Sequence, residues 1–518
     1  MALAKILWVD DEIESLQSQK LFLESKGYEV HALTNGFDAI DYVKENPVDV
    51  VLMDESMPGI TGLETLSKIK EVNQQIPVVL ITKNETENLM DDAIGSQISD
   101  YLIKPVNPNQ VLLSLKKILD NKRLVSEKTT TAYQQQFRNL FMALNSNPDH
   151  NEWMDIYRKL VYWELEMGKS DSPEMREVLQ TQKNEANTEF FKFISRNYAS
   201  WISGKAESSP IMSHQLMKFK VLPHLEKGTP LFFVLLDNLR FDQWKAIQPI
   251  FSESFRVLEE ETFYSILPTA TQYARNAIFS GLLPMEIEKQ FPSEWKNDDE
   301  EGGKNLHEEL FLKAQLKRLK MDGLRVSYTK VVNNQAGLDL VNNIHNLMNN
   351  DLNVIVYNFV DMLSHARTEM EVLKELAGDE VSYRSITQSW FEHSPLHQAL
   401  KKIADKNLKL ILATDHGSVR VKTPYKVVGD KQTTANLRYK HGRNLNYEAK
   451  EVLAFRDPRE AGLPVPTVNS SFIFAREDGY LCYPNNYNYY ANYYRNTFQH
   501  GGISLEEMIV PVIRMGGK

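Results

Sequence analysis

Five polar residues in the first 110 positions lie at the ends of short apolar runs that are typical of β-strands. Asp10 and Asp11 follow the first run, Asp54 follows the third, Thr82 ends the fourth and Lys104 follows the fifth. Because parallel strands end at one edge of a sheet, all five side chains are expected at that edge. Three carboxylates there repel one another unless a divalent cation joins them, and carboxylate and phosphate oxygens suit Mg²⁺. Asp54 is then placed to attack a phosphoryl donor, with Lys104 pairing with the phosphoryl oxygen and Thr82 donating a hydrogen bond to it.

A second set of metal-binding side chains lies in the C-terminal half of the chain, mostly directly after apolar runs. It consists of Asp237, Asp361, His365, Asp415, His416 and His500. Carboxylates and imidazoles together suit two Zn²⁺ or Mn²⁺ ions better than Mg²⁺. Two such ions, held roughly 3.5–4 Å apart, clamp the attacking and leaving oxygens of an in-line phosphoryl displacement. The sequence therefore predicts a two-metal centre for phosphoryl chemistry, although any one of these residues alone would more simply cap a helix or face solvent.

Thr271 is the predicted nucleophile of this centre. It lies in the segment ILPTATQYARNAIFSG, after a strand-like run and at the start of a predicted helix. The N-terminus of a helix favours a phosphate, because its unpaired N–H groups and its dipole both attract an anion. Bound metal ions would also depress the pKa of the hydroxyl and make it a nucleophile at neutral pH.

Four residues near these motifs carry groups that could bind a substrate phosphate. Arg240 and Arg275 could clamp it in bidentate fashion, or could form structural salt bridges. Lys440 and His441 could contact it, or could be ordinary loop residues. The Tyr- and Asn-rich stretch 480–498 could stack on nucleobases, or could pack against its own domain. The residues alone leave these alternatives open.

The elements that position these residues fall into three predicted domains. Residues 1–120 alternate strand-like and helical patterns, which indicates a doubly wound (βα)5 parallel sheet. Residues 121–205 have helical periodicity only and predict a helical bundle, and residues 204–210 suit a linker. Residues 211–518 again alternate, and three apolar runs there predict buried parallel strands of an α/β domain.

The composition narrows the class of protein. The chain has 518 residues, a formal net charge of −10 and ordinary apolar and charged fractions, which fit a folded multidomain protein. Cys482 is the only cysteine, so intramolecular disulfides are excluded and a reducing cytoplasm is expected. Residues 1–119 hold 19 acidic residues, 10 lysines and no arginine, so nearly all of the net charge lies there. The rest of the chain is almost neutral, and divalent metals would make its site attractive to phosphate.

The first ordered set of residues resembles a response-regulator receiver domain. The resemblance rests on Asp10-Asp11, the segment D54ESMPGITG, Thr82 and Lys104-Pro105, over about the first 120 residues. It implies that Asp54 is the phosphoacceptor, that a sensor histidine kinase supplies the phosphoryl group and that Mg²⁺ is bound. It also implies that Tyr101 is the aromatic switch residue that reorients together with Thr82.

The second ordered set resembles the alkaline phosphatase superfamily, most closely its PglZ branch. The matching segments are DNLRFD, PTATQYAR, DMLSH, TDHG and HGGISLEEMIVP, in this order over residues 211–518. The resemblance implies one metal held by Asp361, His365 and His500. It implies a second metal held by Asp237, Thr271, Asp415 and His416, with a phosphothreonine intermediate on Thr271. Threonine stands where many relatives have serine, which favours diesterase-like members.

The order of receiver, helices and PglZ-type domain is similar to that of cytoplasmic response regulators that control the type IX secretion system. That likeness implies a zinc-dependent phosphodiesterase acting on linear or cyclic oligonucleotides, and we expect phosphorylation to gate it through a homodimer. The alternative is a non-catalytic regulator with a structural metal site that docks a membrane component of the secretion system or a transcription factor. A phosphotransferase similar to phosphoglycerate mutase is a weaker third possibility, because its nucleophile is usually serine.

Overall fold

The computed structural model describes residues 4–83, 98–169, 173–358, 360–363, 378–430, 434–467 and 469–518, and of residues 120–131 and 173–174 it describes the backbone alone. These residues form two compact units, 1–132 and 133–518. Within the described residues, no helix has both the length and the apolar character needed to cross a membrane.

The first unit is built on a five-stranded parallel sheet with the strand order β2-β1-β3-β4-β5. The strands are β1 (Lys5–Val9), β2 (Glu29–Leu33), β3 (Val50–Asp54), β4 (Val78–Thr82) and β5 (Asp100–Ile103). The helices are η1 (Ile13–Leu16), α1 (Gln17–Ser25), α2 (Gly36–Glu45), α3 (Gly62–Val72) and the start of α5 (Pro108–Asn145). Successive strand residues point to opposite faces of the sheet, where they form two separate apolar cores. The predicted doubly wound receiver fold is confirmed.

The second unit is built on a six-stranded mixed sheet with the order β7-β18-β10-β6-β9-β8. Strands β10 (Lys409–Ala413), β6 (Leu231–Leu236), β9 (Leu352–Tyr357) and β8 (Val326–Val331) are parallel to one another. The long strands β18 (Ile509–Gly517) and β7 (Phe255–Tyr264) extend this sheet in antiparallel fashion. The three strands predicted from apolar runs are therefore β6, β9 and β10, and they lie side by side in the middle of the sheet.

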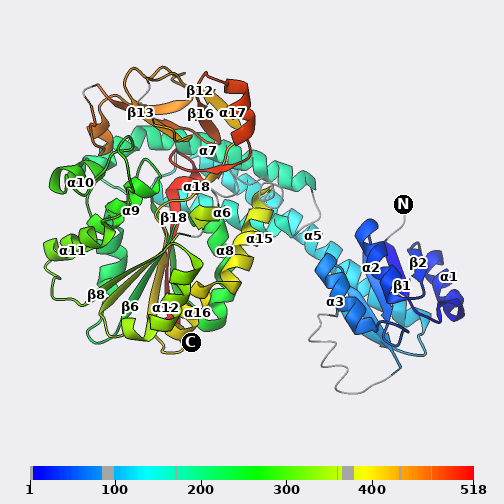
Figure 1. Cartoon of the computed structure of the whole chain (residues 1–518). Helices are drawn as coiled ribbons and strands as arrows, with labels where there is room; N and C mark the ends of the chain where they lie inside the picture. The colour runs from blue at the N-terminus through cyan, green and yellow to red at the C-terminus, as the bar shows by residue number, and fades with distance from the viewer. Residues whose placement is uncertain are drawn as a thin grey trace. The chain divides into compact units, whose positions relative to one another are not determined.

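Helices pack on both faces of this sheet (Figure 1). Along the chain, the helices between the strands of this sheet are α8 (Phe241–Ser254), α9 (Thr271–Ser280), α10 (Pro284–Gln290), α11 (Glu308–Arg318), α12 (Asn334–Leu347), α15 (Glu380–His393), α16 (Pro395–Ala404) and α18 (Leu505–Met508). Short helical turns precede β6 and follow β14; they are η2 (Ser213–Gln215), η3 (Met217–Val221), η4 (Leu222–His224) and η5 (Pro458–Ala461).

A lobe of small sheets lies beyond one end of the central sheet (Figure 1). Strand β11 (Val419–Arg420) pairs with β17 (Phe498–Gln499), and β12 (Thr423–Lys426) pairs with β16 (Gly479–Cys482). A third sheet has the order β13 (Tyr439–Gly442), β15 (Ser471–Ala475) and β14 (Val452–Phe455). Helix α17 (Tyr487–Tyr494) holds most of the tyrosines of the Tyr- and Asn-rich stretch.

The middle helices share one hydrophobic core with the central sheet. Helices α6 (His150–Gly168) and α7 (Pro173–Ile202) contribute Trp153, Phe190 and Trp201. The ring of Trp153 packs against Phe190, and the rings of Phe190 and Trp201 pack against Tyr264 of β7. The helical segment expected at 121–205 thus divides in the structure, because its residues from 133 onward belong to the second compact unit. The prediction of three separate domains stays a prediction.

Candidate active site and phosphorylation site

The receiver carboxylates meet at the carboxyl edge of the first sheet, as expected. Asp10 follows β1 and Asp54 ends β3, and both are buried. Lys104, directly after β5, places its Nζ 2.9 Å from Asp10 Oδ2 and 2.9 Å from Asp54 Oδ1. Asp11 is exposed, and its carboxylate lies within 4.8 Å of those of Asp10 and Asp54. Three oxygen donors so close together suit a single Mg²⁺ beside the predicted phosphoacceptor.

Burial and repulsion set the charge state of this site. Burial raises the pKa of Asp54, and the neighbouring Asp10 raises it further, while the hydrogen bond from Lys104 opposes both. Burial alone would lower the pKa of Lys104, but its hydrogen bonds to Asp10 and Asp54 outweigh that effect and raise it. The lysine therefore stays a cation and offsets part of the repulsion between the carboxylates.

The two predicted switch residues lie at different depths. Thr82 is buried at the end of β4, and its carbonyl accepts the backbone N–H of Lys104 at 2.8 Å. Tyr101, in the middle of β5, has 43% of its surface exposed. Thr82 is thus buried next to the residue that pairs with Asp54, while Tyr101 is partly exposed, which is the separation that the predicted switch from site to surface needs.

In the second unit the strand ends bring the predicted metal-binding side chains together. Asp237 directly follows β6, Asp415 lies two residues after β10, and Asp361 lies in a helical turn four residues after β9. Asn238 adopts a left-handed backbone (φ 64°), which asparagine tolerates better than most residues. Its N–H donates to Asp415 Oδ1 at 3.2 Å and its side-chain amide donates to Asp361 Oδ1 at 3.4 Å. The sharp turn after β6 thereby ties the three strand ends to one another.

His416 presents one ring nitrogen to this cluster in a defined state. Its Nδ1 lies 3.0 Å from the carbonyl oxygen of Gly417, which can only accept a hydrogen bond, so Nδ1 carries the proton. The lone pair of Nε2 then faces Thr271 Oγ1 at 3.0 Å, Asp237 Oδ1 at 3.8 Å and Asp415 Oδ1 at 4.0 Å. Ligand atoms of both carboxylates and this imidazole lie within 4.8 Å of one another. A neutral imidazole with two carboxylates is a donor set that fits Zn²⁺, and the backbone carbonyl that orients the ring is typical of metal-binding histidines.

Thr271 begins α9 in the arrangement that the sequence predicts. Its Oγ1 lies 3.4 Å from Asp237 Oδ1 as well as beside His416. The preceding residue, Ala270, has no side chain that could cap the helix, so the first N–H groups of α9 are available to a bound anion. The hydroxyl, the predicted metal ligands and the helix N-terminus therefore converge on one point.

The remaining predicted ligands form the adjoining part of the site. His500 Nε2 lies 3.5 Å from Asp361 Oδ1, and its Nδ1 lies 3.2 Å from the carbonyl oxygen of Thr269, which fixes the tautomer in the same way as in His416. The rings of His416 and His500 stack with centroids 4.2 Å apart. His365, the third predicted ligand of this metal, lies outside the described residues.

Arg275 forms structural salt bridges, which is one of the two alternatives that the sequence leaves open. It is completely buried, it forms ion pairs with Asp237 and with Asp415 (2.9 Å), and it approaches Glu308 at 3.5 Å. Burial followed by the charge of Asp415 raises the pKa of Asp237 well above its usual range, although Arg275 opposes the shift. In Asp415 the balance is the reverse: burial would raise the pKa of this carboxyl, but the charge of Arg275 outweighs burial and the pKa is lowered. Arg275 is thus a positioning residue behind the metal ligands, because its guanidinium is already occupied by carboxylates.

The guanidinium of Arg240 is likewise occupied by carboxylates. Only 1% of its surface is exposed, and its guanidinium pairs with Asp242 at 2.6 Å and with Glu380 at 2.6 Å. The rings of Tyr383 and Phe498 lie 5.5 Å and 5.0 Å from it. The salt-bridge alternative holds for both arginines.

Lys440 and His441 lie in strand β13 and are buried, so neither is a loop residue or an exposed phosphate contact. Lys440 Nζ donates to the carbonyl of Thr434 at 3.0 Å, and burial lowers its pKa to about 7. His441 Nε2 lies 3.4 Å from Asp298, which also accepts hydrogen bonds from the hydroxyls of Tyr273 (3.1 Å) and Tyr439 (2.9 Å). Successive residues of a strand face opposite ways, which is why the two neighbours have separate surroundings.

Three residues of the site escaped the sequence analysis. Asn238 joins the strand ends, Glu308 lies behind Arg275, and Asp298 gathers the tyrosines beside α9. Asn238 had a local signal, since asparagine directly after a strand-end aspartate suits a left-handed turn. Glu308 and Asp298 had none, because each lies in an acidic surface-like segment of the sequence.

Family models match three consecutive parts of the chain. The BREX system PglZ alkaline phosphatase-like domain matches residues 216–515, the PorX response regulator linker domain matches residues 123–202, and the response regulator receiver domain matches residues 6–116. The first match alone covers more than half of the 518 residues. The order of the three is the one that the sequence motifs predict.

Among curated proteins, similar ones are bacterial transcriptional regulators. The phosphoglycerate transport system transcriptional regulatory protein PgtA of Salmonella typhimurium is 30% identical over 154 residues, which is 30% of this chain and 35% of that protein. The transcriptional regulatory protein ZraR of Klebsiella oxytoca is 36% identical over 132 residues, 26% of this chain and 30% of that protein. The chain thus spans about a third of the length of these relatives.

Among solved structures, similar ones are isolated receiver domains. A CheY-like receiver domain protein from Methanospirillum hungatei is 28% identical with a TM-score of 0.23, and the match covers 23% of this chain and 96% of that one. A receiver domain protein from Clostridium thermocellum is 31% identical with a TM-score of 0.23, covering 24% and 98%.

Proposed function

The chain belongs to the PglZ family of alkaline phosphatase-like proteins and has the PorX-type architecture of receiver, linker and PglZ domain, and we propose that it is a phosphorylation-controlled phosphodiesterase. In this proposal a sensor histidine kinase phosphorylates Asp54, and the PglZ domain then cleaves linear or cyclic oligonucleotides with Thr271 as nucleophile. We further propose that the protein controls type IX secretion, on the strength of its likeness to regulators of that system.

The observation that carries the proposed activity is the position of Thr271. Its hydroxyl lies 3.0 Å from His416 Nε2 and 3.4 Å from Asp237 Oδ1, at the uncapped N-terminus of α9. Zn²⁺ bound by Asp237, Asp415 and His416 would lower the pKa of the hydroxyl and stabilise negative charge on the phosphoryl group. A second Zn²⁺, with Asp361, His365 and His500 as ligands, would complete the pair.

The residues of the chain supply the rest of the reaction. Thr271 Oγ attacks the phosphorus and the alcohol of the diester leaves, so that a phosphothreonine forms. Water then cleaves the P–O bond to Thr271 and releases a phosphate monoester. The first N–H groups of α9 bind the phosphoryl oxygens, and Arg275 holds Asp237 and Asp415 in place throughout.

The preference for a nucleotide-containing substrate is inferred from helix α17. Helix α17 carries tyrosines in stacked pairs, and Tyr489 has 64% of its surface exposed. Exposed aromatic rings stack on nucleobases at roughly 1–3 kcal/mol for each base. Such a surface supports a nucleotide-containing substrate.

The proposed gate begins at Asp54. Phosphorylation adds negative charge beside Lys104, which draws Thr82 toward the phosphoryl group and changes the position of Tyr101 at the surface. We propose that two phosphorylated chains then pair as a homodimer, with Mg²⁺ bound by Asp10, Asp11 and Asp54. Sedimentation with and without beryllofluoride tests this step, and an unchanged mass contradicts it.

The decisive experiment combines metal analysis with a diesterase assay on the full chain. Purified protein should contain up to two Zn²⁺ and should hydrolyse bis(p-nitrophenyl) phosphate and a dinucleotide, faster with beryllofluoride than without. The Thr271→Ala variant should retain the fold and lose turnover, whereas Thr271→Ser keeps a hydroxyl nucleophile and serves as the matched control. Equal turnover of wild type and Thr271→Ala overturns the proposed activity.

A non-catalytic regulator remains the second candidate, because the similar curated proteins are transcriptional regulators. In that case the metal site is structural and the chain signals by docking a membrane component of the secretion system or a transcription factor. A Thr271→Ala strain that secretes normally favours this function over the enzymatic one.

A further inference from the structure

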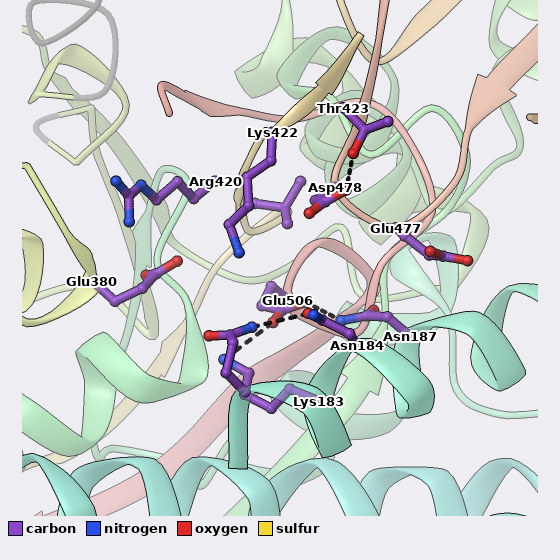
Figure 2. Close-up of a pocket in the computed structure, with 12 residues that line it drawn as sticks. Lys183, Asn184, Asn187, Glu380, Arg420, Lys422, Thr423, Glu477, Asp478 and Glu506 are labelled. Carbon is purple, nitrogen blue, oxygen red and sulfur yellow. Dashed lines mark hydrogen bonds and ion pairs between the residues drawn. The ribbon is translucent and has the colours of Figure 1, made fainter. Parts of the chain in front are cut away.

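A polar cavity of about 290 Å³ lies away from the metal ligands, between helix α7 and the lobe of small sheets. One wall is a stripe of α7 with the spacing of a single helix face, Gln180, Lys183, Asn184 and Asn187. The opposite wall comes from the segment Val419–Thr423 and from Glu477 and Asp478, and Glu380 and Glu506 complete the lining. Figure 2 shows Lys422 extending from the strand side toward Asn184 and Glu506, with Arg420 and Glu380 together at one side. Val419 is the one apolar side chain among these residues, so the cavity suits a small polar ligand.

All four carboxylates of the lining already have partners. Glu380 pairs with Arg240 at 2.6 Å, and Glu477 pairs with Arg476 at 2.7 Å. Asp478 accepts the hydroxyl of Thr423 at 3.1 Å. Glu506 lies 3.4 Å from Lys183 and accepts the Asn187 amide at 3.1 Å, and Figure 2 draws both contacts.

Two cations of the lining have no such partner. In the described part of the chain, neither Arg420 nor Lys422 forms an ion pair within 4.0 Å, and Arg420 Nε is buried without a hydrogen-bond acceptor. Arg420 interacts electrostatically with Asp379, but that carboxylate already accepts the Ser382 N–H at 2.8 Å at the start of α15. A buried donor without an acceptor costs stability, so a ligand that supplies acceptors would be favoured.

We propose that this cavity is a second anion site that binds a small phosphate monoester. A phosphate offers several acceptor oxygens, which match the fork of a guanidinium, a flexible ammonium and side-chain amides on the facing helix. Asn184 accepts a hydrogen bond from Gln180 through its oxygen at 2.9 Å, which turns its own N–H groups outward as donors. Arg420 and Lys422 on one wall and Asn184 on the other thus present donors from both sides.

The same cavity is joined to the loops that hold the metal ligands. Arg420 pairs through its backbone with Phe498, two residues before His500. A Cβ on Gly417, next to His416, would lie 2.0 Å from the carbonyl oxygen of Glu506, so the two segments are in tight backbone contact. A ligand that draws Arg420 and Lys422 toward α7 would therefore act on both metal-bearing loops, which makes the site a regulatory one.

Two sources of the phosphate group are separable by titration. Full-length protein is treated with a chelator, which removes metal-dependent phosphate binding, and is then titrated calorimetrically with inorganic phosphate and with adenosine 5′-monophosphate. Binding of one equivalent is expected. Tighter binding of the nucleotide identifies an organic monoester such as the product of the proposed diesterase, and equal binding identifies inorganic phosphate. Absence of heat with both probes at millimolar concentration overturns the proposal.

Matched variants locate the binding. Arg420→Gln with Lys422→Gln should weaken the affinity at least tenfold, whereas Lys426→Gln, an exposed lysine of the same segment outside the cavity, should leave it unchanged. Equal affinity of the double variant and the wild type overturns the assignment. If the double variant does not fold, Lys422→Gln alone and a crystal of the wild type soaked in tungstate provide the same decision, since density must appear between Lys422 and Asn184. Because these readouts need no turnover, they stand even if the diesterase activity fails.

Discussion

Two carboxylate clusters lie at the carboxyl ends of parallel strands, one in each sheet, and their buried charges are balanced in different ways. In the receiver, Asp10 and Asp54 share one lysine, and the third carboxylate, Asp11, is open to solvent. In the PglZ domain, Asp237 and Asp415 are held by the fully buried Arg275. A lysine is a movable point charge, whereas a guanidinium fixes two carboxylates in one geometry. We therefore expect the first cluster to accept and release a phosphoryl group, and the second to keep the geometry of the proposed metal ligands constant through the proposed reaction.

Of the changes proposed here, Thr271→Ala should have the largest effect, and that effect is on the rate of diester hydrolysis. Thr271→Ala takes away the proposed nucleophile of the fixed cluster, so kcat should fall on the order of 10³-fold or more, because residues that act as a catalytic unit are worth that much. Steady-state hydrolysis of bis(p-nitrophenyl) phosphate measures it, and phosphorylation of Asp54 by acetyl phosphate should be unaffected. A fall of less than tenfold, with zinc content unchanged, removes the hydroxyl from the mechanism.

Removing Arg275, which holds Asp237 and Asp415, should cause the largest loss of stability. Arg275→Met leaves Asp237 and Asp415 buried without their cation, and removal of one partner from a buried pair typically costs about 3–5 kcal/mol. Denaturant unfolding of metal-free protein measures the change. Arg459→Met is the matched control, because Arg459 makes a similar contact with Asp457 at the surface, and its loss should not be measurable. Equal stability of the two variants means that the buried pair is not what holds the strand ends.

Lys440, another buried cation of the same unit, has no carboxylate within ion-pair distance among the described residues and so tests the effect of burial alone. Burial lowers its pKa to about 7 from 10.5, so the folded state binds this proton more weakly than the unfolded state does. Between these two values the unfolded state carries more protons, and the free energy of unfolding should therefore rise with pH, by at most about 1.4 kcal/mol for each pH unit. The penalty is fully present below pH 7 and is gone near 10.5.

Comparison with Lys440→Met isolates this slope. The variant lacks the titrating group, so the stability of the wild type should increase relative to it as the pH rises from 7 to 10. Lys426→Met removes an exposed lysine from a nearby strand and should track the wild type at every pH. Parallel pH profiles for wild type and Lys440→Met would mean that the ammonium is solvated in the folded protein.

The sequence predicts the position of residues at strand ends, but not the roles of residues whose partners are distant in sequence. Residues at strand ends could be placed from sequence, because an apolar run followed by Asp10, Asp54, Asp237 or Asp415 fixes their location in a parallel sheet. The role of Arg275 could not, since its partners Asp237, Asp415 and Glu308 are far apart in sequence and burial decides whether a guanidinium faces a ligand or a carboxylate. Strand β18 and the larger part of β7 were not predicted, for a similar reason. Their pairing depends on residues more than 240 positions apart, and β7 has a charged middle segment, Glu259–Glu261, that lacks a strand-like apolar run.

We expect the smallest change in stability from replacing Lys104 of the receiver. Lys104→Met removes the cation that Asp10 and Asp54 share, at a cost of about 1.5–3 kcal/mol, because hydrogen bonds to charged groups contribute that much. Added Mg²⁺ should restore most of the loss, since a divalent ion among the three carboxylates replaces the offsetting charge. Thermal unfolding of the receiver transition with and without Mg²⁺ measures both, and Lys44→Met, whose partner Asp41 is at the surface, is the control. If Mg²⁺ stabilises the wild type and Lys104→Met by the same amount, lysine and metal act independently, and the receiver cluster is as fixed as the one around Arg275.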